Sequence, residues 1–316
     1  MGKFLVTGGA GFIGSHTVDR LLHDGHEVVA VDNLRTGHRE NLAAALTSSR
    51  FELLEADISD QSTVADIFQR HRFDGVIHLA ALVSVPESFH EPALNFRLNV
   101  QSLDLVARQC LARGCRRLVF ASSAAVYGDH TELPNRETAL PAPLSPYAAA
   151  KIAGEYLLAG YSAGAPLQTV CLRYFNIYGP RQDPGSPYSG VLSIFARRFS
   201  TGLPITVFGD GQQSRDFVSV HDVATINTRA LVDSLPDNGV CNVCTGSAIT
   251  LNEIIGVFQQ HFPDSPEPAH EPARAGDIRH SRGDPEKLRS YLGMTTRIDI
   301  QEGLGELIDW YRQQQD

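Results

Sequence analysis

The chain has 316 residues, of which 42% are hydrophobic and 20% charged, as in a globular protein with room for a large core. Its formal net charge of −9 argues against nucleic acid or an anionic membrane as a partner, although a few local arginines would suffice to hold an anionic small molecule. No apolar run is long enough to span a bilayer, the N-terminus does not read as a signal peptide, and five cysteines suit the reducing cytoplasm, where we expect the protein to reside.

Strand-like and helix-like segments alternate through the first half of the chain. Short apolar runs at 3–8, 27–32, 51–57, 74–81, 116–123 and 167–176 are predicted strands. Helical patterns lie between them, for example at 92–112 and 147–161. Because the runs are almost wholly apolar, they suit a parallel sheet covered on both faces. We predict a Rossmann-type α/β fold, a doubly wound parallel sheet that forms a first domain over residues 1–176.

The composition changes after residue 176. Glycine and proline cluster at 178–190, and a helix near 190–201 and short strands at 205–209 and 216–220 follow. Residues 264–285 are rich in Pro, Asp and Arg, and a last helix is predicted at 301–314. We expect a smaller C-terminal α/β lobe over 177–316 that binds the substrate, with a segment at about 214–246 returning to the first domain.

A glycine-rich turn follows the first predicted strand. In the sequence VTGGAGFIGSH, Gly8, Gly11 and Gly14 allow a tight turn and a close approach of the backbone to a pyrophosphate at a helix N-terminus. Asp32 ends the second strand at the distance expected for an acceptor of ribose hydroxyl groups. Its carboxylate repels a 2′-phosphate, so the pattern favours NAD over NADP, although the nearby Arg35 would suit that phosphate.

The last residue of the third predicted strand leaves two interpretations open. Asp57 is placed to contact an adenine edge, but it would equally serve as a cap at the end of a strand.

Cys241 and Cys244 form a C-x-x-C pair within GVCNVCTG. The pair could be redox-active or half of a zinc site. However, the segment alternates like a strand and no second C-x-x-C follows it, so we favour two buried structural cysteines and expect no metal.

The stretch SPYAAAK carries the candidate chemistry. Ser145 is a suitable helix cap, and Tyr147 and Lys151 then lie on one face of the helix, one turn apart. Ser122 and Ser123 emerge upstream at the carboxyl end of a strand, which is the edge where open α/β sheets bind ligands.

These residue types suggest an acid–base mechanism. Lys151 and a cationic nicotinamide would favour the phenolate form of Tyr147, and lowering its pKa by ~3 units needs roughly 4 kcal/mol of differential interaction. Tyr147 would then take a hydroxyl proton while a hydride leaves to NAD, and Ser123 would hydrogen-bond the reacting oxygen.

The glycine motif, the run SSAAVYG at 122–128 and Tyr147-x-x-x-Lys151 resemble the extended short-chain dehydrogenase/reductase family. Within that family the chain resembles nucleotide-sugar epimerases over nearly its whole length, through LRYFNIYGPRQDP, FGDGQQSRDFVSVHDVA and RAGDIRHS in that order. The resemblance implies a Ser-Tyr-Lys triad, tightly held NAD, a UDP-sugar substrate and a homodimer built from helices 92–112 and 147–161.

The expected site residues follow from the motifs and the resemblance together. In the substrate pocket, Asn176 would contact the diphosphate, Arg215 and Arg274 would clamp the phosphates, Asp277 would meet ribose hydroxyls, and Thr206 and Phe208 would lie beside the uracil. The other residues expected to bind substrate are Ser84, Ser123, Tyr147, Val191 and Ser281. The residues expected to bind the cofactor are Gly8, Gly11, Phe12, Ile13, Asp32, Asn33, Asp57, Ile58, Leu79, Ala80, Ala81, Asn99, Tyr147, Lys151 and Tyr174.

The resemblance also narrows the reaction. Related dehydratases place an Asp-Glu pair just after the residue that matches Ser123, whereas this chain has Ala124 and Ala125 there. Elimination is therefore unsupported, and we expect 4-epimerisation through a transient 4-keto sugar, with hydride returned to its other face.

The sugar is inferred from the pocket walls. Ser281 stands where glucose-restricted relatives have a tyrosine, so it would leave room for a 2-acetamido group. The segment 80–88 resembles the sugar wall of N-acetylhexosamine epimerases, with Ser84 able to bond the sugar, although Val83 replaces a smaller residue. We expect UDP-GlcNAc/UDP-GalNAc, with UDP-Glc/UDP-Gal as a further pair. The alternatives are another nucleotide sugar, such as a uronic acid or pentose, or a non-catalytic sensor, which would tend to lack Tyr147 or Lys151.

Overall fold

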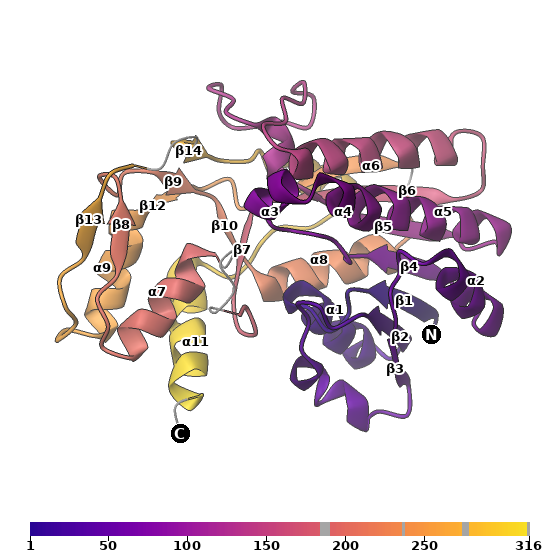
Figure 1. The fold of residues 1–316 in the computed structure, drawn as a ribbon, viewed down its shortest axis with the longest axis horizontal. Helices are drawn as coiled ribbons and strands as arrows, with labels where there is room; N and C mark the ends of the chain where they lie inside the picture. Colours follow the sequence, from indigo (N-terminus) through magenta and orange to yellow (C-terminus); the bar gives the residue numbers. More distant parts are fainter. Residues whose placement is uncertain (184–189, 236–237, 274–277, 315–316) are drawn as a thin grey trace.

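The computed structural model describes residues 1–183, 190–235, 238–273 and 278–314. A seven-stranded parallel sheet forms the larger part of the molecule (Figure 1), in the order β11-β6-β5-β4-β1-β2-β3. The strands are β1 (Lys3–Thr7), β2 (Glu27–Asp32), β3 (Phe51–Glu55), β4 (Gly75–His78), β5 (Arg117–Ser123), β6 (Gln168–Tyr174) and β11 (Gly239–Val243). The predicted Rossmann-type sheet is therefore confirmed, with its topological switch point between β1 and β4.

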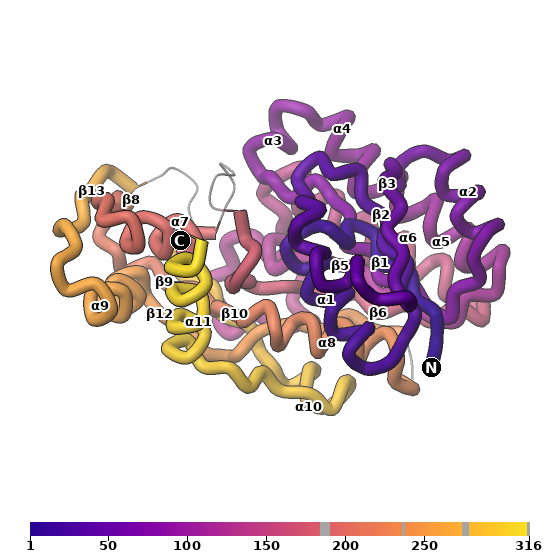
Figure 2. Tube along the Cα trace, turned by 90° about the horizontal axis from the view of Figure 1, so that it is seen from below, coloured from indigo at the N-terminus to yellow at the C-terminus, as the bar shows by residue number. Residues whose placement is uncertain are grey.

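Each face of this sheet is buried under helices, as its apolar strands predict. Alternate residues point to opposite sides: Val6 and Ala30 lie in one hydrophobic core, and Leu5 and Val29 lie in the other. The first core includes α1 (Phe12–His23) and α8 (Val220–Val232), on the lower side in Figure 1 and nearer the viewer in Figure 2. The second includes α2 (Gln61–Arg70), α5 (Ser102–Ala112) and α6 (Pro146–Ser162).

The predicted helix at 92–112 is not one regular α-helix. It consists of α4 (Pro92–Phe96), a π-helical turn η3 (Arg97–Gln101) and α5, and it follows the short helix α3 (Val85–His90). The wide turn carries the buried Asn99. Phe96 and Tyr156 are exposed on α4 and α6, the helices expected to form a homodimer, and that assembly stays a prediction.

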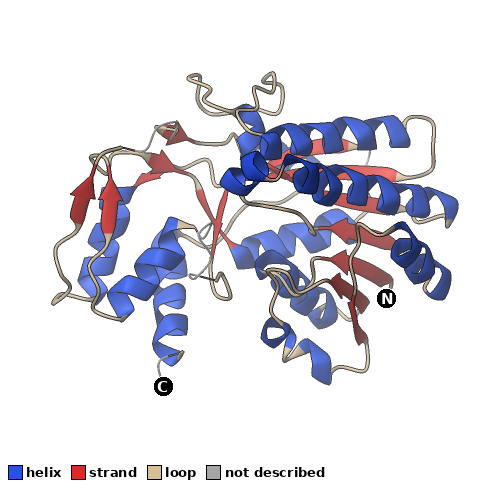
Figure 3. Cartoon of the chain, in the orientation of Figure 1, coloured by secondary structure: helices blue, strands red, loops and turns tan. Residues whose placement is uncertain are grey.

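After β6 the chain crosses to a smaller lobe with its own core, seen at the left of Figure 3, and it returns to the main sheet through α8 and β11. The lobe contains α7 (Val191–Ser200), α9 (Leu251–His261) and α11 (Ile300–Gln313). Its strand pairs are β7 (Asn176–Tyr178) with β10 (Phe217–Ser219), and β8 (Thr206–Phe208) with β13 (Ala269–Glu271). A small sheet joins β12 (Ile249–Thr250), β9 (Ser214–Arg215) and β14 (His280–Ser281). The other elements are η1 (Arg39–Leu42), η2 (Ala45–Thr47), η4 (Ala124–Tyr127) and α10 (Glu286–Leu292).

Within the described ranges, no helix combines the length and the apolar character that crossing a membrane requires.

Candidate active site

The glycine turn forms a backbone cradle between β1 and α1. Gly8 has φ +71°, and a Cβ atom there would lie 2.7 Å from the backbone nitrogen of Ala80, on the loop after β4. A Cβ at Gly14 would lie 2.0 Å from the carbonyl oxygen of Gly8, so only glycine lets α1 approach the turn this closely. Gly11 is the N-cap of α1 and no side chain caps that end, so the geometry suits a pyrophosphate.

Asp32 lies beside this cradle at the carboxyl end of β2. Its two carboxylate oxygens accept hydrogen bonds from the backbone N–H groups of Ala10 and Leu34, each at 2.9 Å. Burial raises the pKa of Asp32, and the backbone hydrogen bonds oppose that rise. Each oxygen retains a lone pair with which to accept a ribose hydroxyl. Arg35 forms an ion pair with Glu87 of α3, so the arginine that would suit a 2′-phosphate already has an acidic partner.

Two of the remaining cofactor candidates, Asp57 and Tyr174, have side chains that already form hydrogen bonds within the protein. Asp57 accepts from Ser59 N at 2.8 Å and Ser59 Oγ at 2.7 Å, which is the geometry of the capping alternative. The Tyr174 hydroxyl donates to Asn227 Oδ1 of α8 at 2.6 Å. Their contacts with the cofactor stay predictions.

Ser123, Tyr147 and Lys151 meet at the carboxyl end of β5. Ser145 caps α6 by accepting from Ala148 N at 3.1 Å, as predicted, and this sets the helix over the end of β5. The Tyr147 hydroxyl shares a hydrogen bond with the side chain of Ser123. Lys151 Nζ lies 5.6 Å from the centroid of the Tyr147 ring and 4.9 Å from that of Phe120.

Burial dominates the electrostatics of this cluster. It lowers the pKa of Lys151 to about 7, and it raises the pKa of Tyr147, which the hydrogen bond from Ser123 opposes. The lowering of the Tyr147 pKa by Lys151 together with a cationic nicotinamide stays a prediction, because within the chain burial opposes the charged form of both side chains. The lowering would depend on the positive charge of a bound nicotinamide.

A hydrogen-bonded network holds the first turn of α6 in place. Ser88 Oγ accepts from Tyr147 N at 3.2 Å, and Asn95 Nδ2 donates to the carbonyl oxygen of Pro146 at 3.0 Å. Asn99 donates to Asn95 Oδ1 at 2.7 Å and binds both the N–H and the carbonyl group of Leu82. The side-chain amide of Asn99, a predicted cofactor ligand, therefore forms its hydrogen bonds with other residues of the protein. Sequence analysis missed Ser88 and Asn95, since nothing local to them indicates these partners.

The predicted sugar wall lies next to this network. Ser84 is buried and caps α3 by accepting from Glu87 N at 2.9 Å, so its hydroxyl proton remains able to bond a sugar. Val83, which precedes it, is 62% exposed.

Most of the predicted substrate residues lie in the lobe or at its junction with the main domain. The register of β9 and β14 places Ser281 opposite Arg215. Asn176 donates from its backbone N–H and from Nδ2 to the carbonyl oxygen of Asp216, at 3.0 and 3.3 Å. Thr206 and Phe208 lie in β8, and Val191 begins α7. Arg274 and Asp277 lie outside the described residues.

Asp216 is a further residue that sequence analysis missed. Its buried carboxylate accepts from the backbone N–H groups of Thr245, Gly246 and Gly283, and from the Thr245 hydroxyl. Burial raises its pKa, which these bonds oppose. The Asp216 carboxylate thus joins the start of β10 to two distant loops, and β10 pairs with β7, the strand that begins with Asn176.

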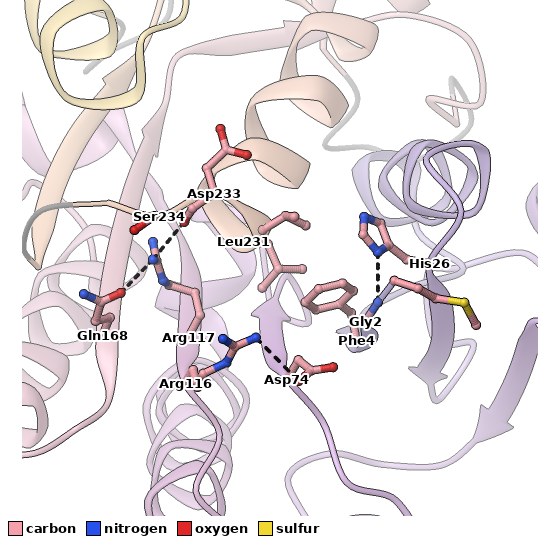
Figure 4. Close-up of a pocket in the computed structure, with 12 residues that line it drawn as sticks. Gly2, Phe4, His26, Asp74, Arg116, Arg117, Gln168, Leu231, Asp233 and Ser234 are labelled. Carbon is pink, nitrogen blue, oxygen red and sulfur yellow. Dashed lines mark hydrogen bonds and ion pairs between the residues drawn. The ribbon is translucent and has the colours of Figure 1, made fainter.

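A cavity of about 330 Å³ opens at the opposite edge of the sheet, near the amino ends of β1, β4 and β5 (Figure 4). Its walls include His26, Asp74, Arg117 and Gln168. Because the catalytic candidates lie at the carboxyl ends of the strands, this cavity is not part of their site.

The cysteine pair at 241 and 244 is buried, and burial raises the pKa of both thiols, which fits the structural interpretation. No group of three or more potential ligands within the described ranges could hold a metal ion.

Comparison with known proteins agrees with this geometry. The model of the NAD dependent epimerase/dehydratase family matches residues 4–244. A UDP-glucose 4-epimerase of Mycolicibacterium smegmatis is 37% identical over 313 residues, which cover 98% of each chain. The crystal structure of a UDP-glucose 4-epimerase with UDP-glucose, from Thermotoga maritima, has a TM-score of 0.94 at 36% identity and covers 99% of this chain and 100% of its own. A UDP-N-acetylglucosamine 4-epimerase from Methanobrevibacter ruminantium, in complex with UDP-N-acetylmuramic acid, has a TM-score of 0.93 at 35% identity and covers 99% of each chain.

Proposed function

The chain belongs to the NAD-dependent epimerase/dehydratase family, and on that basis we propose that it is a 4-epimerase of UDP-sugars. The observation that carries the proposal is the contact of Ser123, Tyr147 and Lys151 at the carboxyl edge of β5, two strands away from the glycine cradle of β1. Together they provide an acid–base group, an oxygen ligand and a cation beside a dinucleotide site.

Tyr147 and Ser123 have different roles in the proposed reaction. Tyr147 accepts the proton of the sugar 4-hydroxyl, and Ser123 donates a hydrogen bond to the same oxygen as it becomes a carbonyl. When bound, NAD supplies the acceptor that takes a hydride from C4 and returns it, so no net redox change occurs. After the 4-keto sugar has turned in the pocket, Tyr147 gives the proton back to the oxygen. The cradle, Asp32 and Lys151 would hold the cofactor.

Elimination lacks the residues it would need. The turn η4 starts directly after Ser123 with Ala124 and Ala125, neither of which can protonate a leaving hydroxyl. Oxidation at C4 followed by return of the hydride is the chemistry that remains.

The lobe would hold the nucleotide. Asn176 would contact the diphosphate, and Arg215 and Arg274 would bind phosphate oxygens through their planar guanidinium groups. Asp277 would bind ribose hydroxyls, and Thr206 and Phe208 would contact the uracil. The position of Arg215 on β9, opposite Ser281 on β14, supports this assignment because phosphate and sugar are adjacent in the substrate.

For the sugar, we favour UDP-GlcNAc/UDP-GalNAc, with UDP-Glc/UDP-Gal as a further pair. The small side chain of Ser281 would leave space for a 2-acetamido group. The hydroxyl group of the buried Ser84 could donate a hydrogen bond to the sugar. A glucose-restricted enzyme is the second candidate, because the M. smegmatis and T. maritima relatives are named UDP-glucose 4-epimerases. A non-catalytic sensor is disfavoured by the intact contact of Tyr147 with Ser123.

Ser281→Tyr tests the choice of sugar. We expect the variant to lower kcat/KM for UDP-GlcNAc at least about tenfold more than for UDP-Glc, because the tyrosine ring would fill the space of the acetamido group and a clash of this size costs about 1–3 kcal/mol. The measurement is the ratio of the two rates in wild type and variant. Ser290→Tyr, on the exposed face of α10, is the control and should leave the ratio unchanged. Equal losses on both substrates would remove Ser281 as the determinant.

A further inference from the structure

A buried ion pair lies under the catalytic cluster. Arg173 Nε and a terminal nitrogen donate to Glu155 Oε1 and Oε2 at 2.9 and 2.7 Å, and the two side chains are only 5% and 6% exposed. Ser122 Oγ donates to Glu155 Oε1 at 2.5 Å. The guanidinium carbon of Arg173 also lies 4.9 Å from the centroid of the Tyr127 ring. Every oxygen of this carboxylate therefore has a donor.

Each member of the pair is adjacent to a predicted catalytic or cofactor residue. Glu155 follows Lys151 by one turn of α6, so both lie on the same helical face. Ser122 precedes Ser123 on β5, and the strand register places Arg173 directly opposite Ser122. A buried pair contributes little net stability compared with apolar residues of the same size, so stability alone does not account for it.

The pairing has an electrostatic consequence for Lys151. Glu155 is the carboxylate on the lysine's own helical face, and its oxygens are taken by Arg173 and Ser122. In the parts of the chain that the structure covers, no carboxylate forms an ion pair with Lys151. When Lys151 is protonated, its positive charge is therefore not neutralised by an ion pair with any described carboxylate.

We propose that Glu155, Arg173 and Ser122 are positioning residues, which hold α6 against β5 and β6 and keep the Glu155 carboxylate away from Lys151. This inference rests on the proposed function, because it takes Tyr147 to be the base. Without the Arg173 charge, the Glu155 carboxylate would form an ion pair with Lys151. The lysine charge would then be neutralised and would no longer favour ionisation of Tyr147.

The other ionisable groups around the cluster do not place a second charge beside Lys151 or Tyr147. His78 on β4 faces Lys151 and stays neutral, since burial and Lys151 lower its pKa to about 3. Tyr127 on η4 stays neutral, since burial raises its pKa to about 12. On β6, burial likewise raises the pKa of Cys171 and Tyr174. On the helices beside α6, Glu87 pairs with Arg35, and Asp104 bonds Tyr161 and Arg108. The other charged or titratable side chains on these helices are exposed to solvent: His90, Glu91 and Arg97.

The test is the pH dependence of kcat for a UDP-sugar that the wild type converts. For Arg173→Met we expect the limb on which activity rises with pH to move up by about one unit, because a Glu155 carboxylate that pairs with Lys151 neutralises the cation beside Tyr147 and so raises the pKa of the phenol. Arg173→Lys keeps the charge without the two-pronged geometry, so its limb should stay at the wild-type pH while kcat falls. If Arg173→Met does not fold, Glu155→Gln/Arg173→Met removes both charges and should also keep the wild-type limb.

Arg117→Met is the matched control. Arg117 is equally buried in β5, but it lies at the amino end of the strand and bonds Gln168 and two backbone carbonyls (Figure 4). This variant should lose stability and keep the wild-type limb. An unmoved limb in folded Arg173→Met, or an equal shift in Arg117→Met, would overturn the inference. Near-normal turnover in Tyr147→Phe would instead overturn the proposed function, so the two failures are distinguishable.

Discussion

Tyr147→Phe is expected to lower kcat for UDP-sugars about 10²–10⁴-fold, the range that a positioned acid–base group contributes. The substitution removes one oxygen atom and leaves the ring in contact with Lys151. It removes the group that accepts the substrate proton and the hydrogen bond to Ser123. Steady-state turnover, followed by NMR of the sugar, measures the loss. The thermal unfolding midpoint and the content of bound NAD should stay close to wild type.

Tyr156→Phe is the control for this variant. Tyr156 lies on the same helix but is 65% exposed, so the identical atomic change should leave turnover unaffected. Near-normal turnover in Tyr147→Phe would contradict the mechanism. Comparable losses of turnover in both variants would show that the loss at Tyr147 is not specific to its position in the active site.

Gly14→Ala is expected to weaken the binding of NAD. The added methyl group would lie 2.0 Å from the carbonyl oxygen of Gly8 and 2.9 Å from Gly9 Cα, and these are backbone atoms that cannot turn aside. Either the cradle or α1 must move, at a cost of about 1–3 kcal/mol or more. A loss of that size corresponds to a drop in NAD affinity of about tenfold or more. Titration calorimetry with NAD, together with the unfolding midpoint, measures both effects.

The control for Gly14→Ala is Gly256→Ala in α9. A Cβ at Gly256 would meet no atom within 4 Å, and alanine favours a helix over glycine by about 1 kcal/mol. This variant should unfold at the same temperature as wild type or higher, with unchanged NAD binding. Wild-type NAD affinity in Gly14→Ala would show that the close approach of α1 to the turn is not needed for the cofactor.

The parts of the fold that the sequence predicted are those with local signals. Apolar runs such as EVVAVD gave the strands of the main sheet, and the glycine spacing located the cradle. The contact of Ser123 with Tyr147 was predictable because both follow from rules about the carboxyl edge of a parallel sheet and about one helical face.

Properties that depend on distant partners were not predictable. Glu155 interrupts an apolar helix and Arg173 an apolar strand, a signal that each needs a buried partner, but only the fold shows that they pair with each other. The rise in the pKa of Tyr147 depends on burial by several elements, which spacing does not reveal. The π-helical turn at Arg97–Gln101 has no periodic signature in so short a segment.

The most direct test of the central claim follows the hydrogen at C4. Purified protein, without added cofactor, is incubated in water with UDP-GlcNAc and, separately, with UDP-Glc, each carrying deuterium at C4, and the products are resolved by NMR. We expect the C4 epimer to form with its deuterium retained, because the same hydride is removed and returned, and to form faster from UDP-GlcNAc. An epimer with solvent hydrogen at C4, or no epimer from either sugar, would contradict the proposed 4-epimerisation.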